Sequence, residues 1–305
     1  MKLSMSNFKK LKVAIIGSGN IGTDLMMKII RSDYLECTIM AGRNHNSKGM
    51  KHAISNGIPV SYLGIKSIIT NSEICDLVFD CTTAQAHITH WAILKKLGKI
   101  VIDMTPAKLG ELCVPAINAR ECVQTNSANN ISMITCGGQA SIPVAKAICD
   151  VTDSVEYIET VSSIASLSAG PATRLNLDEY IDATERGIQK FTGVMNTKAI
   201  LILNPANPPI NMQTTVYVKA TNPNLTKIKS SVEEMLLLIQ KYVPQYELLV
   251  PPYIKNGRVM VTVKVRGAGD YLASYAGNLD IINCAAIDVA ERYAVSSVRA
   301  EKDYA

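Results

Sequence analysis

The sequence predicts an α/β protein in which a Rossmann-type, doubly wound sheet is joined to an α+β domain for substrate binding or dimerisation. Its 305 residues are enough for about two domains, and 48% apolar against 19% charged residues is typical of a globular chain. The first half alternates short apolar runs with amphipathic stretches, which favours parallel strands with right-handed helical crossovers. From about Val155 longer alternating runs predict a mixed, largely antiparallel sheet with helices on one face.

The first predicted strand, Leu11–Ile16, is short, apolar and rich in β-branched residues. A glycine turn at 17–22 follows it directly, and an amphipathic helix then extends to Arg31. The same alternation continues through this half, with strands at 37–41, 76–80 and 99–104 and helices at 47–56 and 84–97.

A final helix at 279–295 is apolar on one face, and we expect it to return to the first domain. The dinucleotide-binding domain would then comprise residues 1–153 and 275–305, and the catalytic or dimerisation domain residues 154–274. Within this second domain the patterns predict strands at 155–165, 198–203, 214–220 and 258–266 and helices at 177–192 and 225–242.

Composition and charge exclude several classes of protein. The net charge of +5 is modest and the Lys and Arg residues are scattered, so no nucleic-acid partner is expected. No apolar run approaches the roughly 18 to 20 residues of a membrane span, and no signal peptide is evident, so we expect a cytoplasmic protein. The eight cysteines show no C-x-x-C spacing and no nearby His pairs, which predicts neither a metal site nor a disulfide framework.

The turn after the first strand has the spacing of a dinucleotide-binding motif. Gly17 permits the turn, Gly19 lets the backbone approach a pyrophosphate, and Gly22 lets the helix pack on the strand. The unpaired N–H groups at the helix N-terminus favour phosphate binding. The strand-turn-helix context therefore predicts a nicotinamide cofactor bound at Gly17, Ser18, Gly19, Asn20, Ile21 and Gly22.

The end of the second strand departs from the usual NAD pattern. An NAD site normally carries Asp or Glu there to bind the ribose 2′-hydroxyl, but this chain has Ala41-Gly42-Arg43-Asn44. Arg43 is a candidate to bind a 2′-phosphate, which would favour NADP, or to lie over the adenine of NAD; it can equally be a solvated loop residue. The choice between NAD and NADP stays open.

Cys136 is the candidate nucleophile. An apolar strand is expected to end at this residue, two glycines follow, and a helix is expected to begin near Ser141 with Pro143 in its first turn. A thiol at a helix N-terminus has a lowered pKa, and the N–H groups of Gly137 and Gly138 are candidates for an oxyanion site. The alternative is that Cys136 only packs as a small apolar residue.

Two polar, glycine-containing loops are further candidates for ligand binding, at 166–176 and 267–280. Arg174 can bind a ligand or anchor the first loop, and Asn278 can bind a ligand or cap the last helix. All four histidines precede residue 91, so the second domain offers no imidazole as a base for Cys136.

The chain resembles the acylating acetaldehyde dehydrogenases, the NAD- and coenzyme A-dependent enzymes of the meta-cleavage pathways of aromatic hydrocarbon catabolism. The resemblance covers about residues 11 to 295 and is carried, in order, by KVAIIGSGNIGTDLM, MITCGGQASIP, SAGPATRLN, ILNPANPP, VPQYELL and YAGNLDI. It is more specific than the glycine motif, because the TCGGQA and SAGP strings are characteristic of that family.

This resemblance implies an oxidoreductase that converts acetaldehyde, or a similar short aldehyde, with NAD and coenzyme A into acetyl-CoA and NADH. It implies that Cys136 forms an acyl-thioester, and that the chain is a homodimer within a larger complex with a 4-hydroxy-2-oxovalerate aldolase. It places the nicotinamide cofactor at Ser18–Ile21, at Asn278 and at the segment of Ser168, Ala169, Gly170, Pro171, Ala172, Thr173, Arg174, Leu175 and Asn176.

Two departures from the family pattern affect these expectations. Many relatives have an Arg-Asp pair after the NPA-x-PP string, whereas this chain has Gln213-Thr214, so Thr214 stands where a candidate acid/base carboxylate would be. The stretch between Val250 and Val259 is also short, which bears on the aldolase interface or the coenzyme A entrance. A phosphate-dependent semialdehyde dehydrogenase and a non-catalytic, aldolase-supporting nucleotide-binding subunit remain alternatives.

Overall fold

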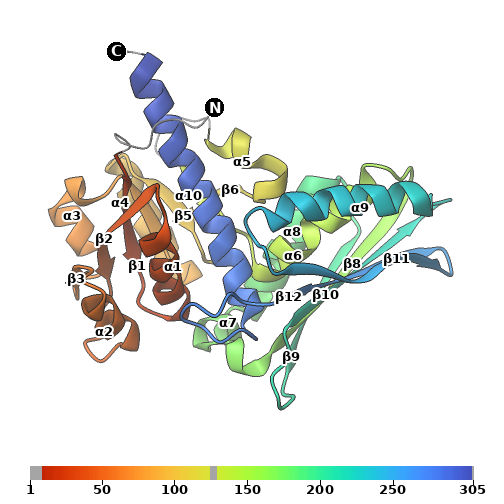
Figure 1. Cartoon of the computed structure of the whole chain (residues 1–305), viewed down its shortest axis with the longest axis horizontal. Helices are drawn as coiled ribbons and strands as arrows, with labels where there is room; N and C mark the ends of the chain where they lie inside the picture. The colour runs from red at the N-terminus through yellow and green to blue at the C-terminus, as the bar shows by residue number, and fades with distance from the viewer. Residues whose placement is uncertain (1–8, 124–128, 304–305) are drawn as a thin grey trace.

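The computed structural model describes residues 9–123 and 129–303, excluding the side chains of 171–172 and 297–303 (Figure 1). Seven parallel strands form the first sheet: β1 (Leu11–Ile16), β2 (Leu35–Ala41), β3 (Val60–Ser61), β4 (Leu77–Asp80), β5 (Ile100–Asp103), β6 (Glu111–Leu112) and β7 (Asn130–Ser132). Their order across the sheet is β3-β2-β1-β4-β5-β7-β6. The helices of this half are α1 (Asn20–Arg31), α2 (Lys48–Ser55), α3 (Lys66–Thr70), α4 (Ala84–Lys96) and α5 (Pro115–Val123), with a 3₁₀ turn, η2 (Ser72–Ile74).

Five strands form the second sheet: β8 (Val155–Ala165), β9 (Thr197–Asn204), β10 (Met212–Ala220), β11 (Tyr246–Lys255) and β12 (Arg258–Val265). Their order is β11-β12-β10-β8-β9, and every neighbouring pair is antiparallel except β8 and β9. The remaining elements are α6 (Cys136–Cys149), η3 (Ser166–Ser168), α7 (Pro171–Leu175), α8 (Leu177–Thr192), α9 (Leu225–Gln240) and α10 (Gly277–Asp303).

The predicted fold class is confirmed by these two sheets. The first sheet is buried on both faces, so its strands are nearly continuous apolar runs, and Val13 to Ile16 of β1 are all buried. The second sheet buries one face, because alternate residues of β10 such as Val216 and Val218 are buried while Tyr217 is not. Val216 and Val218 share a core cluster with Ile142 of α6 and Ile228 of α9, which places these helices on that face.

Most predicted elements are present with ends shifted by a few residues, but β11 and the short β3, β6, α3 and α5 were not predicted. Pro251 and Pro252 argue against a strand in the sequence because proline cannot donate to a ladder. β11 tolerates them because it is the outermost strand of its sheet, and its register to β12 shifts at this point. The loop predicted at 166–176 is also partly helical, since η3 and α7 lie within it.

The last helix, α10, runs between the two halves of the molecule (Figure 1). Ile282, Ala285 and Val289 belong to the same core cluster as Val13 and Ile15 of β1. The helix therefore contributes to the core of the first sheet, although it lies more than 250 residues from β1 in the sequence. In the described part of the chain, no helix has the length and apolar character that crossing a membrane requires.

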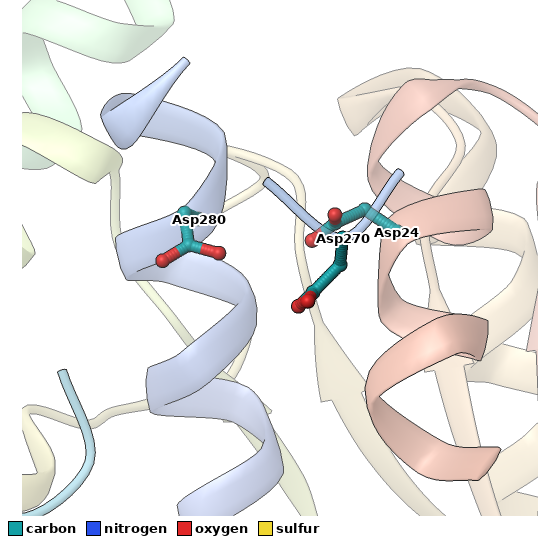
Figure 2. A group of neighbouring side chains, drawn as sticks. All are labelled: Asp24, Asp270 and Asp280. Atoms are coloured by element: carbon teal, nitrogen blue, oxygen red, sulfur yellow. The ribbon is translucent and has the colours of Figure 1, made fainter. Parts of the chain in front are cut away.

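Three carboxylates meet where α1, α10 and the loop before α10 come together (Figure 2). Asp24 projects from α1, Asp280 from α10 and Asp270 from the loop. Their shared cation is Lys28, whose Nζ lies 3.3 Å from Asp24, 2.8 Å from Asp270 and 2.6 Å from Asp280. All four side chains are at least nine-tenths buried, so the cluster is an internal ion-pair network whose centre is the lysine ammonium.

Candidate active site

A partly open cavity of about 90 Å³ lies where the two halves of the chain meet, and Cys136 is one of the residues that line it. Five residues that the sequence predicts as site residues line it together: Ile21, Cys136, Thr173, Asn176 and Asn278. The other walls are Thr82, Thr83, Met104, Thr105, Pro106, Ile134, Thr135, Tyr180, Leu279 and Ile282. A wider surface hollow of about 600 Å³ beside Cys149 contains none of the predicted site residues.

Cys136 is the first residue of α6, so the helix begins five residues earlier than predicted. The strand before it, β7, ends at Ser132 instead of Cys136, and Pro143 lies inside the helix, not in its first turn. The prediction was wrong because the two glycines after the cysteine indicate a loop by propensity. In the structure, Thr135 caps α6 by accepting a hydrogen bond from the Gly138 N–H at 2.9 Å.

The backbone just before Cys136 is strained. Ile134 has a φ of 64°, in the left-handed region that a β-branched residue rarely adopts. Such a conformation costs on the order of 1–3 kcal/mol and persists only where the surroundings impose it. The strain lies in the turn that directs Cys136 into the cavity.

The environment of the Cys136 thiol opposes its ionisation. Burial raises the pKa of Cys136 to about 11, and hydrogen bonds with the Tyr180 hydroxyl and with nearby backbone N–H groups offset only part of this effect. The predicted low pKa is therefore wrong for this structure, because desolvation outweighs the helix N-terminus. The Gly138 N–H is also not a free oxyanion donor, since it is bonded to Thr135.

Tyr180 is a site residue that the sequence analysis missed. Its hydroxyl oxygen lies 3.7 Å from Cys136 Sγ, and the residue is 7% exposed on the inward face of α8. In an amphipathic helix, an aromatic residue on the buried face is interpreted as core packing. No local sequence pattern marks Tyr180; in the structure Gly137 leaves room for its hydroxyl, because a Cβ at position 137 would lie 2.1 Å from it.

The glycine turn of 17–22 has the structure that its sequence predicts. Gly17 has a φ of 112°, and a Cβ at Gly22 would lie 2.1 Å from the Gly17 carbonyl oxygen. A Cβ at Gly19 would meet nothing within 4 Å, so this position is open toward solvent. No described side chain caps α1, and Gly19 and Asn20 at its start are exposed. The first N–H groups of the helix are therefore left without a side-chain acceptor.

The remaining cofactor candidates are divided between cavity, surface and packing. Arg43 is exposed just after β2, and its stem lies against Gly64. Arg174 anchors its loop, because its Nε donates to the Ala169 carbonyl at 3.1 Å and its Nη2 to the Ser166 carbonyl at 3.0 Å. Ser168 is buried, Leu175 is exposed, and Ser18 lies within the glycine turn. Gly170 directly precedes α7. The side chains of Pro171 and Ala172 lie outside the described part of the structure.

Two buried polar atoms in the cavity wall have no hydrogen-bond partner in the structure, namely Asn278 Oδ1 and Thr105 Oγ1. Asn278 is 1% exposed and Thr105 is 3% exposed. Asn278 lies within the first turn of α10, which begins at Gly277, so the predicted alternative of a helix cap is wrong. Unpaired buried polar atoms are uncommon, and here both belong to residues that line the cavity beside the thiol.

Two of the histidines belong to a buried network beneath this cavity. The Asp80 carboxylate is 2.9 Å from His87 Nδ1 and 2.8 Å from His90 Nδ1, and its other oxygen accepts a hydrogen bond from the Thr82 hydroxyl. Burial acts to raise the pKa of Asp80, but the two imidazoles outweigh it and lower the pKa. Burial raises the pKa of Asp103 to about 7. Each carboxylate holds one threonine of the cavity wall: Asp80 accepts a hydrogen bond from the Thr82 hydroxyl, and Asp103 accepts one from the Thr105 N–H.

The two halves of the chain match two family models. Residues 12–125 match the semialdehyde dehydrogenase NAD-binding domain, and residues 136–273 match the dimerisation domain of prokaryotic acetaldehyde dehydrogenase. Together with the Rossmann-type sheet, these matches define the class: the chain is an aldehyde dehydrogenase with an NAD-binding domain, and the dimerisation domain supports a homodimer.

Similarity over nearly the whole chain then gives the family. Acetaldehyde dehydrogenase of Pectobacterium atrosepticum is 60% identical over 95% of this chain and 97% of that protein. The enzyme of Spirochaeta aurantia is 54% identical over 94% of this chain and 95% of that protein. The enzyme of Geobacillus stearothermophilus is 47% identical over 96% of this chain and 99% of that protein. The chain belongs to the acetaldehyde dehydrogenase family.

Solved structures with a similar fold are aspartate semialdehyde dehydrogenases. The Vibrio cholerae enzyme, complexed with ASA, has a TM-score of 0.65 at 14% identity and covers 93% of this chain and 98% of that one. The Candida albicans enzyme with NADP has a TM-score of 0.65 at 12% identity, with 93% and 100% covered. At this identity the likeness concerns the fold alone.

Proposed function

We propose that the chain is an acylating acetaldehyde dehydrogenase, which oxidises acetaldehyde or a similar short aldehyde with NAD and transfers the acyl group to coenzyme A. The observation that carries this proposal is the place of Cys136, whose thiol shares one cavity with Ile21 of the glycine turn and Asn278 of α10. A nucleophilic sulfur beside a dinucleotide-binding turn is the arrangement that aldehyde oxidation through a thioester requires.

The cavity and the glycine turn fit a nicotinamide dinucleotide. The open space at Gly19 and the uncapped start of α1 suit a pyrophosphate, and the unpaired Asn278 Oδ1 can accept a hydrogen bond from a carboxamide N–H. Thr173 and Asn176 would border the same ring. Bound NAD supplies a pyridinium ring that accepts a hydride at C4. Arg43, exposed beyond β2, would contact the adenosine end and decides between NAD and NADP.

Cys136 would form and release the acyl group. Its Sγ adds to the aldehyde carbon, giving a hemithioacetal whose oxygen would face the N-terminus of α6. Loss of a hydride from that carbon leaves an acyl-thioester on Sγ. The coenzyme A thiolate then attacks the acyl carbon, forming acetyl-CoA and releasing Cys136 as the leaving thiolate.

The resemblance also supports two assemblies. A homodimer would form through the second domain, whose sheet leaves one face uncovered by its own helices and matches a dimerisation model. A 4-hydroxy-2-oxovalerate aldolase would bind this dimer and deliver the aldehyde. Sedimentation of the chain alone and co-purification with such an aldolase test these two statements separately.

A steady-state assay tests the activity. The purified chain should form NADH from acetaldehyde and NAD only when coenzyme A is present, and Cys136→Ser should reduce the rate to background. Cys149→Ser, at the other end of α6 and outside the cavity, is the matched control and should keep the parental rate. Activity that survives in Cys136→Ser would reject this cysteine as the nucleophile.

The same assay separates the alternatives. Turnover with phosphate in place of coenzyme A would identify a phosphate-dependent semialdehyde dehydrogenase. Binding of NAD without turnover on acetaldehyde, propanal or butanal, even with an aldolase added, would identify a non-catalytic nucleotide-binding subunit. Running each aldehyde with NAD and with NADP gives the cofactor preference.

A further inference from the structure

Cys136 is half-buried in surroundings that disfavour its thiolate, yet the described residues that line its cavity include no carboxylate, imidazole or ammonium group. Cys136 and Tyr180 are the two ionisable residues among them. The proposed function needs a thiolate, so another group must stabilise it. The group in contact with the sulfur is the Tyr180 hydroxyl, at 3.7 Å from Sγ.

We propose that Tyr180 is a catalytic residue: its hydroxyl donates a hydrogen bond to Cys136 Sγ and stabilises the thiolate, while Ser162 and Thr214 hold that hydroxyl in the donating orientation. The inference rests on the proposed function, because it assigns the residue that activates the proposed nucleophile. It requires no carboxylate at position 214.

The partners of the Tyr180 oxygen determine the direction of its proton. The Ser162 hydroxyl and the Gly137 N–H both act to lower the pKa of Tyr180, as groups that donate toward its oxygen do. A tyrosine hydroxyl has one proton, and donation from these two groups would leave that proton to point toward Cys136 Sγ, which is 3.7 Å away. Burial raises the pKa of Tyr180 well above its usual value, so the hydroxyl stays protonated and acts as a donor.

Ser162 and Thr214 extend this contact into a chain of hydroxyl groups. They are directly opposite each other in the β8–β10 ladder, and their Oγ and Oγ1 atoms are 2.9 Å apart. Ser162 is 3% exposed and Thr214 is 1% exposed, and both lie on the buried face of the sheet together with Val216 and Val218. If Thr214 donates to Ser162 and Ser162 to Tyr180, each buried hydroxyl is paired and the chain ends at the sulfur.

Gly137 makes the contact sterically feasible. A Cβ at this position would lie 2.1 Å from the Tyr180 hydroxyl and 3.0 Å from Ser162 Oγ, so a side chain would displace the tyrosine. The glycine beside Cys136 is therefore required for a tyrosine hydroxyl to approach the first turn of α6. Gly137→Ala should consequently slow the alkylation of Cys136 in the same way as removal of the Tyr180 hydroxyl.

Alkylation of Cys136 by iodoacetamide tests the proposal without aldehyde, nicotinamide or coenzyme A. Its rate at a fixed pH below 9 is proportional to the thiolate fraction and is followed for this cysteine alone by mass spectrometry of its peptide. Tyr180→Phe should react about tenfold more slowly, since a hydrogen bond to a charged group changes a pKa by about one unit or more. A steric role predicts the opposite sign, because removing the hydroxyl widens the cavity.

Three further variants complete the test. Tyr253→Phe loses an exposed hydroxyl on β11 and should react at the parental rate. Thr214→Val lies outside the cavity wall, keeps the volume of threonine and should slow alkylation severalfold, with recovery in Thr214→Ser. Circular dichroism confirms that each variant is folded.

Parental alkylation rates in Tyr180→Phe would overturn the proposal, and a parental rate in Thr214→Val would overturn the part played by the hydroxyl chain. Slower alkylation in a protein that makes no NADH would leave this inference standing and reject the proposed function. NADH formation by the parent protein, together with unchanged alkylation in Tyr180→Phe, would support the proposed function and reject this inference.

Discussion

The sulfur of Cys136 is subject to two opposing physical effects. The cavity of about 90 Å³ would shield the proposed acyl-thioester from water, but burial also raises the thiol pKa to about 11. The hydrogen bonds from Tyr180 and the start of α6 act against this increase without cancelling it. Burial of Cys136 would therefore protect the proposed intermediate, but it also means that a nearby group must stabilise the thiolate.

Asn278 gives a prediction at the same scale. Its Oδ1 is a buried acceptor without a partner, which costs about 1–3 kcal/mol. We expect Asn278→Leu, of similar size, to leave the free energy of unfolding unchanged or to raise it, while weakening NAD binding about tenfold. Urea denaturation without NAD and calorimetric titration with NAD measure the two quantities. A loss of stability with unchanged NAD affinity would show that Asn278 is structural.

Sequence reasoning could identify residues that carry their own local signal. Gly17 and Cys136 stand in strand-turn-helix contexts whose chemistry depends on neighbours in the chain. Tyr180 and Ser162 carry no such signal, because a buried aromatic on a helix or a serine on a strand has the pattern of ordinary packing. Their proximity to the sulfur depends on how α8 and β8 pack around α6, and tertiary packing is not encoded in a local motif.

At the scale of elements, α6 shows where propensity fails. Two glycines and an internal Pro143 disfavour a helix over 136–143, yet the helix begins at Cys136. Thr135 overrides that propensity: its Oγ1 accepts from the Gly138 N–H at 2.9 Å and lies 2.7 Å from Thr184 Oγ1 of α8. In contrast, α8 and β8 have clear periodic patterns, and their bounds agree with the prediction.

The Thr135 cap can be tested directly. We expect Thr135→Ala to lower the free energy of unfolding by about 1–2 kcal/mol, because the first turn of α6 loses its capping acceptor and its link to α8. Thr135→Ser retains the hydroxyl and should stay within about 0.5 kcal/mol of the parent. Urea denaturation measures both. Equal stability of Thr135→Ala and the parent would mean that packing alone fixes the start of α6.

At the scale of the whole molecule, the Lys28 cluster joins parts that are distant in sequence. Lys28 belongs to α1. Of its three partners, Asp24 belongs to α1, Asp280 to α10, and Asp270 lies in the loop that follows the second sheet (Figure 2). Burial acts to lower the pKa of Lys28, but its anionic neighbours outweigh this and raise it. The cluster thus holds α10 in its place beside α1, and with it Asn278 in the cavity wall.

Removing the lysine should destabilise the whole fold. In Lys28→Met the carboxylates stay buried without their shared cation, and breaking a buried ion pair in this way costs about 3–5 kcal/mol. Lys190→Met is the matched control, because Lys190 and Glu111 form an exposed ion pair that is worth less than about 1 kcal/mol. Urea denaturation of both variants at pH 7 gives the comparison.

The pH dependence of stability should reverse sign in the same variant. In the parent, burial acts to raise the pKa of Asp270, but bonds from Arg31 and Lys28 outweigh it and lower the pKa, so this stabilisation is present above about pH 4 and is lost on further acidification. In Lys28→Met, a buried carboxylate without its cation has a raised pKa, and the folded state binds protons more readily than the unfolded state. The free energy of unfolding of Lys28→Met should therefore increase between pH 7 and about pH 5, where that of the parent should not. A parallel response of the two proteins would show that the carboxylates do not depend on Lys28.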